Sequence, residues 1–146
     1  MHNLRTVKAA GALAIDRQDR ILFIFKDGKW DLPKGLIDRG NSASKTALQE
    51  TSEETGLAPG NLRVLTELIQ TVHISKYAKV KSLKETNWYL IRYSGPDVAF
   101  TPQRDEGIEH CAWIPLWDLD RPLANCPARI HYLVNFWLKL RKELDY

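Results

Sequence analysis

Three glutamates, Glu50, Glu53 and Glu54, are spaced closely enough in the sequence to act on one ligand. In a helix each residue turns the chain by about 100°, so Glu50 and Glu54 lie within about 40° of each other and Glu53 lies about 60° from Glu50. Ala43 and Ala47 fall on the same side, which places carboxylates on a face whose small residues indicate packing. Clustered carboxylates that lose hydration need a cation or a basic partner.

A solvated acidic helix face is the ordinary alternative to a site for a divalent metal with oxygen ligands. The flanking sequence favours the metal site. Gly35 lies fifteen residues before the first glutamate and follows the stiff segment Trp30 to Lys34, whose proline favours extended backbone before it. A glycine there lets the backbone approach a ligand. Gly56 can close the helix in a left-handed turn, and Asn41 or Ser42 can cap its start.

The segment 35–57 resembles the Nudix box, G-x5-E-x7-R-E-U-x-E-E-x-G-U, where U is a bulky apolar residue. The matching positions are Gly35, Glu50, Glu53, Glu54, Gly56 and Leu57. Three positions depart from the pattern, because Asn41 replaces the first glutamate, Gln49 the arginine and Thr51 the first apolar residue. The upstream Trp-x-Leu-Pro-Lys-Gly resembles the branch that hydrolyses dinucleoside polyphosphates and diphosphoinositol polyphosphates.

The resemblance implies that water attacks a diphosphate bond of a nucleoside-linked polyphosphate with the help of Mg²⁺, for which Mn²⁺ could substitute. Such metals suit oxygen ligands and keep waters that can react. Glu50 and Glu54 match metal ligands of the family, and the carbonyl of Gly35 matches a further one. Glu53 matches a residue that binds metal or accepts a proton from water, and we assign it the catalytic role. Which glutamate is the base stays open.

Further site residues are expected outside the box. Some family members use a glutamate from a later loop, and Glu106 is the first candidate for this metal ligand, with Glu109 second. Lys34, Lys84 and Arg104 are the cations that we expect to bind substrate phosphates. Each has an ordinary alternative, because loop carboxylates and lysines at a strand edge are commonly solvated.

The departures at Asn41 and Gln49 bear on activity. In the family, the arginine at position 49 pairs with a box glutamate; Gln49 donates hydrogen bonds without charge, and a charge-assisted bond is roughly twice as strong. Asn41 can still cap the helix. We therefore expect an intact metal site with looser preorganisation. A domain that senses a nucleotide without turnover is the alternative; the two departures favour it, and the three retained glutamates oppose it.

Periodicity predicts an α/β fold. The expected strands are residues 6–15, 21–25, 62–74, 85–93 and 110–114, and a helix is expected over 128–144. Asp27-Gly28 predicts a hairpin turn, and Gly11 indicates close packing or a bulge. His73, Tyr77 and Trp88 could contact a base, although core packing is their more frequent role. The resemblance implies an α/β/α sandwich, with a mixed β-sheet between helices, as a single domain over residues 1–146.

Composition limits the partners and the location. The chain is 44% hydrophobic and 27% charged, with a net charge of +3, which suits an anionic small molecule and is too weak to indicate nucleic acid. No stretch approaches the ~20 apolar residues of a membrane span, and no secretory signal is recognisable. We expect a cytoplasmic protein with Cys111 and Cys126 reduced. A homodimer is compatible with these features.

Overall fold

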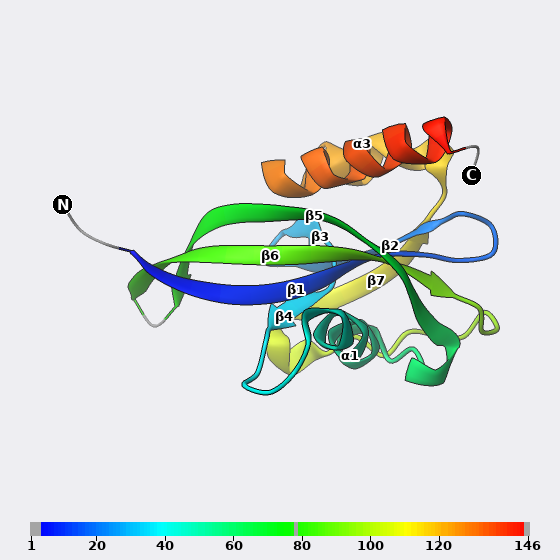
Figure 1. Cartoon of the computed structure of the whole chain (residues 1–146). Coiled ribbons are helices and arrows are strands. Elements are labelled where there is room, and N and C mark those ends of the chain that lie inside the picture. The colour runs from blue at the N-terminus through cyan, green and yellow to red at the C-terminus, as the bar shows by residue number, and fades with distance from the viewer. Residues whose placement is uncertain (1–3, 78, 145–146) are drawn as a thin grey trace.

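The computed structural model describes residues 4–77 and 79–144, and places a mixed β-sheet between helices. The strands are β1 (Arg5–Ile15), β2 (Ile21–Lys26), β3 (Lys29–Asp31), β4 (Lys34–Leu36), β5 (Leu62–Tyr77), β6 (Val80–Tyr93) and β7 (Ile108–Ile114). The helices are α1 (Ala43–Thr55), α2 (Asp120–Leu123) and α3 (Ala128–Glu143), with short 3₁₀ turns η1 (Pro59–Asn61), η2 (Arg104–Glu106) and η3 (Leu116–Asp118). Figure 1 shows α1 and α3 on opposite faces of the sheet, which confirms the predicted α/β/α sandwich.

The sheet opens where β1 and β2 separate. The two strands pair at Ile15 and Ile21, at one end. Further along, β1 pairs with β4 and lies parallel to β6, whereas β2 pairs with β3 and β7. The segment between β3 and β4 bridges the opening, and the N–H of Ala12 donates to the carbonyl of Pro33 at 2.9 Å. This arrangement leaves space between the two halves of the sheet, next to α1.

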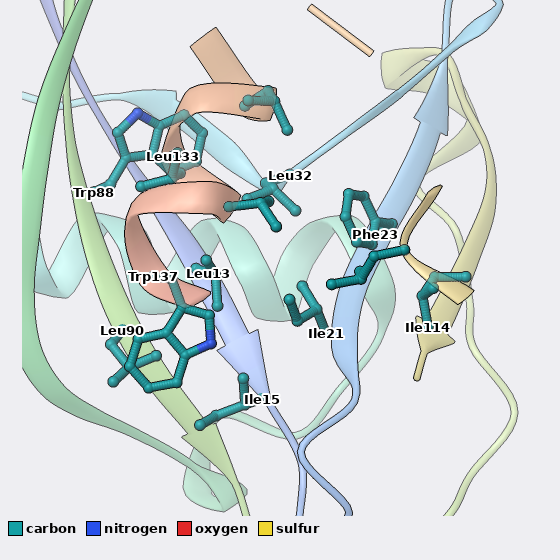
Figure 2. Close-up of a cluster of buried hydrophobic side chains, with 13 residues drawn as sticks. Leu13, Ile15, Ile21, Phe23, Leu32, Trp88, Leu90, Ile114, Leu133 and Trp137 are labelled. Carbon is teal, nitrogen blue, oxygen red and sulfur yellow. The ribbon is translucent and has the colours of Figure 1, made fainter. Parts of the chain in front are cut away.

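Alternation along β1 explains why one helix packs on each face. Leu13 and Ile15 belong to the hydrophobic cluster beneath α3, which Figure 2 shows. Alanines at positions 10, 12 and 14 face the other cluster, where they meet Ala47 of α1, so the small residues let this helix approach the sheet closely. A side chain at Gly11 would clash with the indole of Trp88, since a Cβ would lie 2.4 Å from Cζ3. The predicted close packing at Gly11 is confirmed.

The ends of α1 agree with the sequence. Of the two candidate caps, Ser42 is the one used, and its hydroxyl accepts from the N–H of Lys45 at 3.2 Å. Gly56 closes the helix in the left-handed conformation with a φ of 81°. Thr51 occupies an apolar position of the Nudix pattern and is fully buried. Its hydroxyl donates to the carbonyl of Ala47 at 2.8 Å, so burial leaves this donor paired. The substitution at this position is therefore accommodated within the helix.

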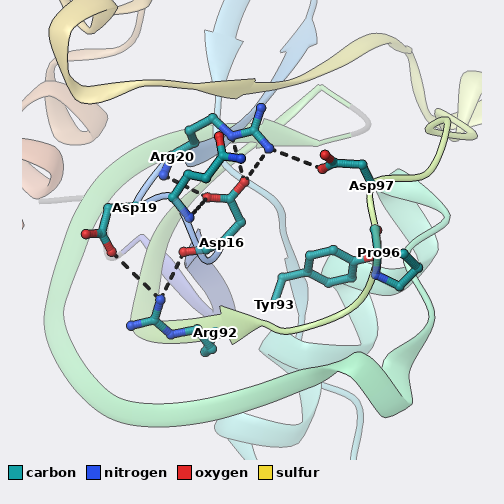
Figure 3. A network of polar contacts seen from close by, with 8 residues as sticks. Asp16, Asp19, Arg20, Arg92, Tyr93, Pro96 and Asp97 are labelled. Carbon is teal, nitrogen blue, oxygen red and sulfur yellow. Dashed lines mark hydrogen bonds and ion pairs between the residues drawn. The ribbon is translucent and has the colours of Figure 1, made fainter.

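A polar network holds the closed end of the sheet, where β1 turns into β2 (Figure 3). The carboxylate of Asp16 accepts from the backbone and side chain of Arg20, which also reaches Asp97. Arg92 of β6 donates to the carbonyl of Asp16 and pairs with Asp19. These bonds tie the β1–β2 turn to β6 at the end opposite to the opening.

The hairpin of β5 and β6 is longer than the sequence predicted. The strands β5 and β6 run to Tyr77 and from Val80, beyond the predicted 62–74 and 85–93, because the polar segment continues the ladder through pairs such as Lys76 with Lys81. This hairpin projects beyond both helices in Figure 1.

Trp88 is fully buried and its indole N–H donates to Thr71, so it packs in the core and does not contact a base. The side chain of Tyr77 lies outside the described residues.

The Asp27-Gly28 hairpin is confirmed, with positive φ values of 53° and 76° at its two central residues. Within residues 4–77 and 79–144, no helix combines the length and the apolar character that a membrane crossing requires.

Candidate active site

A cavity of about 350 Å³ lies where the sheet opens, against the acidic face of α1. We call it the carboxylate cavity. Its charged and polar lining consists of Glu50, Glu53, Glu54, Glu106, Lys26, Lys34, Lys84 and Gln103, together with Gly35. The structure thus brings together the predicted site residues except Arg104 and the second candidate for the loop ligand, Glu109, which do not line this cavity. Arg104 is exposed, does not line the cavity, and donates to the carbonyl of Glu109 at 3.4 Å.

Gly35 is in direct contact with the carboxylate of Glu50. The strand β4 pairs with β1 through Gly35 and Ala10, and α1 packs over it. A Cβ at position 35 would lie 2.2 Å from Cδ of Glu50 and 2.4 Å from its Oε1. A side chain at position 35 would therefore push the Glu50 carboxylate away, whereas glycine lets this carboxylate lie against the backbone of β4.

Glu54 is the most enclosed of the glutamates, with 5% of its surface exposed. The backbone N–H of Lys34 donates to its carboxylate, with N···O distances of 3.3 and 3.5 Å. The carbonyl of Glu54 accepts from the N–H of Gln103 at 3.1 Å, so α1 and the loop before β7 are joined at this residue. Lys34 in turn is held by an ion pair of 3.0 Å between its Nζ and Asp31.

Burial and mutual repulsion destabilise the ionised glutamates. Loss of hydration, followed by the charges of Glu53 and Glu106, raises the pKa of Glu50 from 4.5 to about 7. Burial also raises the pKa of Glu54 well above its usual range, and the charge of Glu50 adds to this against the opposing effect of Lys34. Such carboxylates bind a proton near neutral pH unless a cation compensates their charge.

The donors fit a hard divalent cation that keeps part of its water. Glu50, Glu54 and the carbonyl of Gly35 offer oxygen atoms, the ligands that Mg²⁺ and Mn²⁺ accept. Among the residues that the structure describes, no three His, Cys, Asp or Glu side chains are grouped closely enough to hold a metal by themselves. Mg²⁺ is usually held by one or two carboxylates, with waters and substrate phosphates completing its shell, so this donor set suits it.

The two departures from the Nudix pattern have different local outcomes. Gln49 is exposed, and in the described part of the chain no hydrogen bond joins its side chain to a glutamate. Asn41 is half-buried and does not cap α1; its N–H donates to the carbonyl of Asp38 at 3.0 Å. The loop before α1 is therefore braced through backbone bonds, whereas the position of the family arginine contributes no ion pair.

Sequence reasoning missed Lys26 and Gln103, which both line the carboxylate cavity. Lys26 ends the apolar strand β2 directly before the Asp27-Gly28 turn, and this polar end of a buried strand was the available signal. Nothing in the sequence around Gln103 distinguishes it from other polar loop residues.

Comparisons with known proteins agree with this geometry. A model of the NUDIX domain matches residues 5–134. The chain is 32% identical over 141 residues to a putative 8-oxo-dGTP diphosphatase 3 from Mycobacterium tuberculosis, covering 94% of this chain and 58% of that protein. It is 31% identical over 115 residues to the putative mutator protein MutT4 of the same species, covering 79% and 41%. The chain thus spans about half the length of these curated relatives.

Among solved structures, a binary complex of the Caenorhabditis elegans Ap4A hydrolase superimposes with a TM-score of 0.73 at 19% identity, covering 94% of this chain and 98% of that one. This likeness establishes the fold, with the same layers around the same sheet. With the NUDIX model matching residues 5–134, and its characteristic glutamates lining one cavity, the chain belongs to the Nudix family.

Proposed function

We propose that the chain hydrolyses a diphosphate bond in a nucleoside-linked polyphosphate, either a dinucleoside polyphosphate or a nucleoside triphosphate, with Mg²⁺ as cofactor and Mn²⁺ as a substitute. The observation that carries the proposal is the pairing of acidic and basic groups in one cavity, where glutamates of α1 face Lys26, Lys34 and Lys84. Carboxylates can hold a metal, and lysines can neutralise phosphates, so this combination suits an anhydride substrate.

Each side chain has a proposed part. Glu50, Glu54 and the carbonyl of Gly35 hold the metal, which when bound would polarise phosphate oxygens and lower the pKa of a coordinated water. Glu53 is exposed at the cavity and accepts the proton of the attacking water. Glu106 reaches the cavity from η2 and is a further ligand.

Phosphate binding falls to the lysines. Lys34 is positioned by its ion pair with Asp31, so its ammonium is held in place before the substrate arrives. Lys84 is half-buried on β6 and lines the same cavity. Arg104 is not included, because it lies outside the lining.

The relatives support the class of substrate. By their names, one relative is a putative 8-oxo-dGTP diphosphatase, and the solved structure that superimposes is an Ap4A hydrolase. The substrates in these two names, 8-oxo-dGTP and Ap4A, are nucleotides with phosphoric anhydride bonds. The proposal includes a cytoplasmic location, action on a small molecule and not on nucleic acid, and a single domain over residues 1–146.

A domain that binds a nucleotide without turnover is the second candidate. The exposure of Gln49 favours it, because no positive charge from this position orients a glutamate of the cavity. The acidic cluster opposes it, since raised pKa values at Glu50 and Glu54 are a cost that binding alone does not require.

A panel assay tests the proposal. Diadenosine polyphosphates, nucleoside triphosphates, ADP-ribose and nucleotide sugars are incubated with the protein and Mg²⁺, and the release of phosphate or nucleotide is measured. Hydrolysis of one substrate class supports the proposed enzyme activity if Glu53→Gln abolishes it and Glu67→Gln, at an exposed position of β5, retains it. Metal-dependent binding of a nucleotide without turnover supports the second candidate.

A further inference from the structure

A second cavity adjoins the carboxylate cavity on the side of α3. It has a volume of about 260 Å³ and is lined by basic residues from six elements, namely β2, β3, β4, β5, β6 and α3. We call it the basic cavity, and its positively charged or imidazole side chains are Lys26, Lys29, Lys34, His73, Lys84 and Arg129. Lys26, Lys34 and Lys84 line both cavities, so the two spaces share a wall of ammonium groups.

The residues that line the basic cavity carry an excess of positive charge, although Lys26 and Lys34 also face the glutamates of the carboxylate cavity and lower the pKa of Glu54. Five of its residues are Lys or Arg, against the two acids Asp27 and Asp31. The carboxylate of Asp31 is already engaged by Nζ of Lys34 at 3.0 Å and by Nη2 of Arg129 at 3.8 Å. Over residues 4–77 and 79–144, no Asp or Glu lies within 4.0 Å of the ammonium groups of Lys26, Lys29 or Lys84.

Two polar atoms at the basic cavity are buried and unpaired. Nε of Arg129 and Nδ1 of His73 have no hydrogen-bond partner among the described residues. A buried donor without a partner is costly, and such groups are rare in folded proteins unless a ligand or water completes them. Nε of a guanidinium always carries a proton, so the Arg129 side chain has a free donor at a place where positive charge is already in excess.

The lining cations also interact unfavourably with one another. Burial, and then the charges of Lys34, Lys26 and Arg129, lower the pKa of Lys84. Burial and the neighbouring Arg129 lower the pKa of His73 to about 4, so its ring is neutral near pH 7. An anion in the basic cavity would relieve this repulsion, as a metal would relieve that of the glutamates.

We propose that the basic cavity is a second anion subsite, which holds a phosphate group of the substrate beyond the two phosphates joined by the bond that is hydrolysed. The inference rests on the proposed function for the identity of the substrate. Its guanidinium and ammonium donors match a phosphate, and the shared lysines would place that phosphate in the same chain or ring of phosphates as the scissile bond. The preferred substrate then carries at least one phosphate more than ADP-ribose.

The binding test needs no turnover. Inorganic tripolyphosphate is titrated into the metal-free protein by calorimetry. Without a metal, the glutamates of the carboxylate cavity repel an anion, so the measured binding reports on the basic cavity. Arg129→Gln should weaken binding at least about tenfold, the change expected from one charge-assisted hydrogen bond. Arg63→Gln is the matched control, since Arg63 is an exposed arginine of β5 outside the cavity. Arg63→Gln should bind tripolyphosphate with a dissociation constant within about twofold of that of the native protein.

Folding is checked by circular dichroism and thermal unfolding. If Arg129→Gln does not fold, Lys29→Gln decides, because Lys29 is exposed and makes no ion pair with another described residue. It should weaken binding about threefold or more, as the loss of one partly screened charge. Absence of binding by the native protein, or equal binding by the folded Arg129→Gln or Lys29→Gln and the control, overturns the subsite.

A kinetic test separates the subsite from the activity. Arg129→Gln should lower kcat/KM about tenfold more for diadenosine tetraphosphate than for ADP-ribose, through KM. If neither substrate is hydrolysed but tripolyphosphate still binds in an Arg129-dependent way, the proposed activity fails and the subsite stands. If turnover is normal and the variant affects both substrates equally, the subsite fails and the activity stands. Tighter Arg129-dependent binding of tripolyphosphate than of inositol hexakisphosphate identifies a linear chain as the source, and the reverse identifies a phosphorylated ring.

Discussion

Substituting Gly35 by alanine should displace the carboxylate of Glu50 and change the stability of the fold only slightly. The new Cβ would lie 2.2 Å from Cδ of Glu50, so the carboxylate must move away. The clash involves the far end of a flexible side chain, and a forced rotamer costs about 0.5–1.5 kcal/mol, so we expect a loss of stability of about 1 kcal/mol. A displacement of about 1 Å in a catalytic group can cost about 100-fold in rate, so kcat/KM should fall by roughly this factor.

The assay combines thermal unfolding of the metal-free protein, titration with Mn²⁺ or Mg²⁺, and turnover of the best substrate. Gly60→Ala is the matched control, because a Cβ there meets no atom within 4 Å and should leave all three unchanged. The double variant Gly35→Ala with Glu50→Ala should regain stability relative to Gly35→Ala, since the clashing atoms are gone, without regaining turnover. Native metal affinity and turnover in Gly35→Ala would refute the assignment of Glu50 as a ligand next to this glycine.

Three further predictions concern the charged groups. The pKa of Glu50 is about 7 in the folded chain against an ordinary 4.5, so the metal-free protein should lose stability as the pH rises through this window and level off above it. Mg²⁺ should therefore raise the melting temperature more at pH 8 than at pH 5.5, and an equal rise at both pH values would count against the ligands. Gln49→Arg should raise metal affinity or kcat/KM severalfold, because position 49 lies one turn before Glu53 on α1; no change in either contradicts the account of the missing charge. Glu106→Gln should lower kcat/KM about tenfold and Glu109→Gln less than twofold, because only the first of these two lines the carboxylate cavity; similar effects would remove Glu106 from the site.

The part of the site carried by one helix was predictable from the sequence. The grouping of Glu50 with Glu54 depends on helical spacing alone, and the flanking Gly56 ends the helix in the left-handed conformation for which glycine is suited. The family pattern placed Gly35 at the metal site, whereas its contact with the Glu50 side chain was not predicted. Local geometry decides these features, and sequence spacing encodes local geometry.

The basic half of the site depends on how distant strands are arranged. Lys26 and Lys84 meet because β1 separates from β2, a feature of the sheet that no local pattern reports. Arg104 and Glu106 are two residues apart in one 3₁₀ turn, yet only Glu106 faces the carboxylate cavity, and this orientation follows from the anchoring of the loop at Glu54. Arg129 was assigned to a helix and not to a site, because its role depends on the sheet opposite α3.

The central claim is that the glutamates of α1 act in hydrolysis of a phosphoric anhydride. The most direct measurement is Mg²⁺-dependent turnover of the substrate panel by the native protein, by Glu53→Gln and by Glu67→Gln. We predict that the native protein and Glu67→Gln hydrolyse one class of nucleoside-linked polyphosphate, and that Glu53→Gln folds normally but is slower by at least about 100-fold. Equal turnover by Glu53→Gln, or no turnover by the native protein with any substrate, would contradict the account.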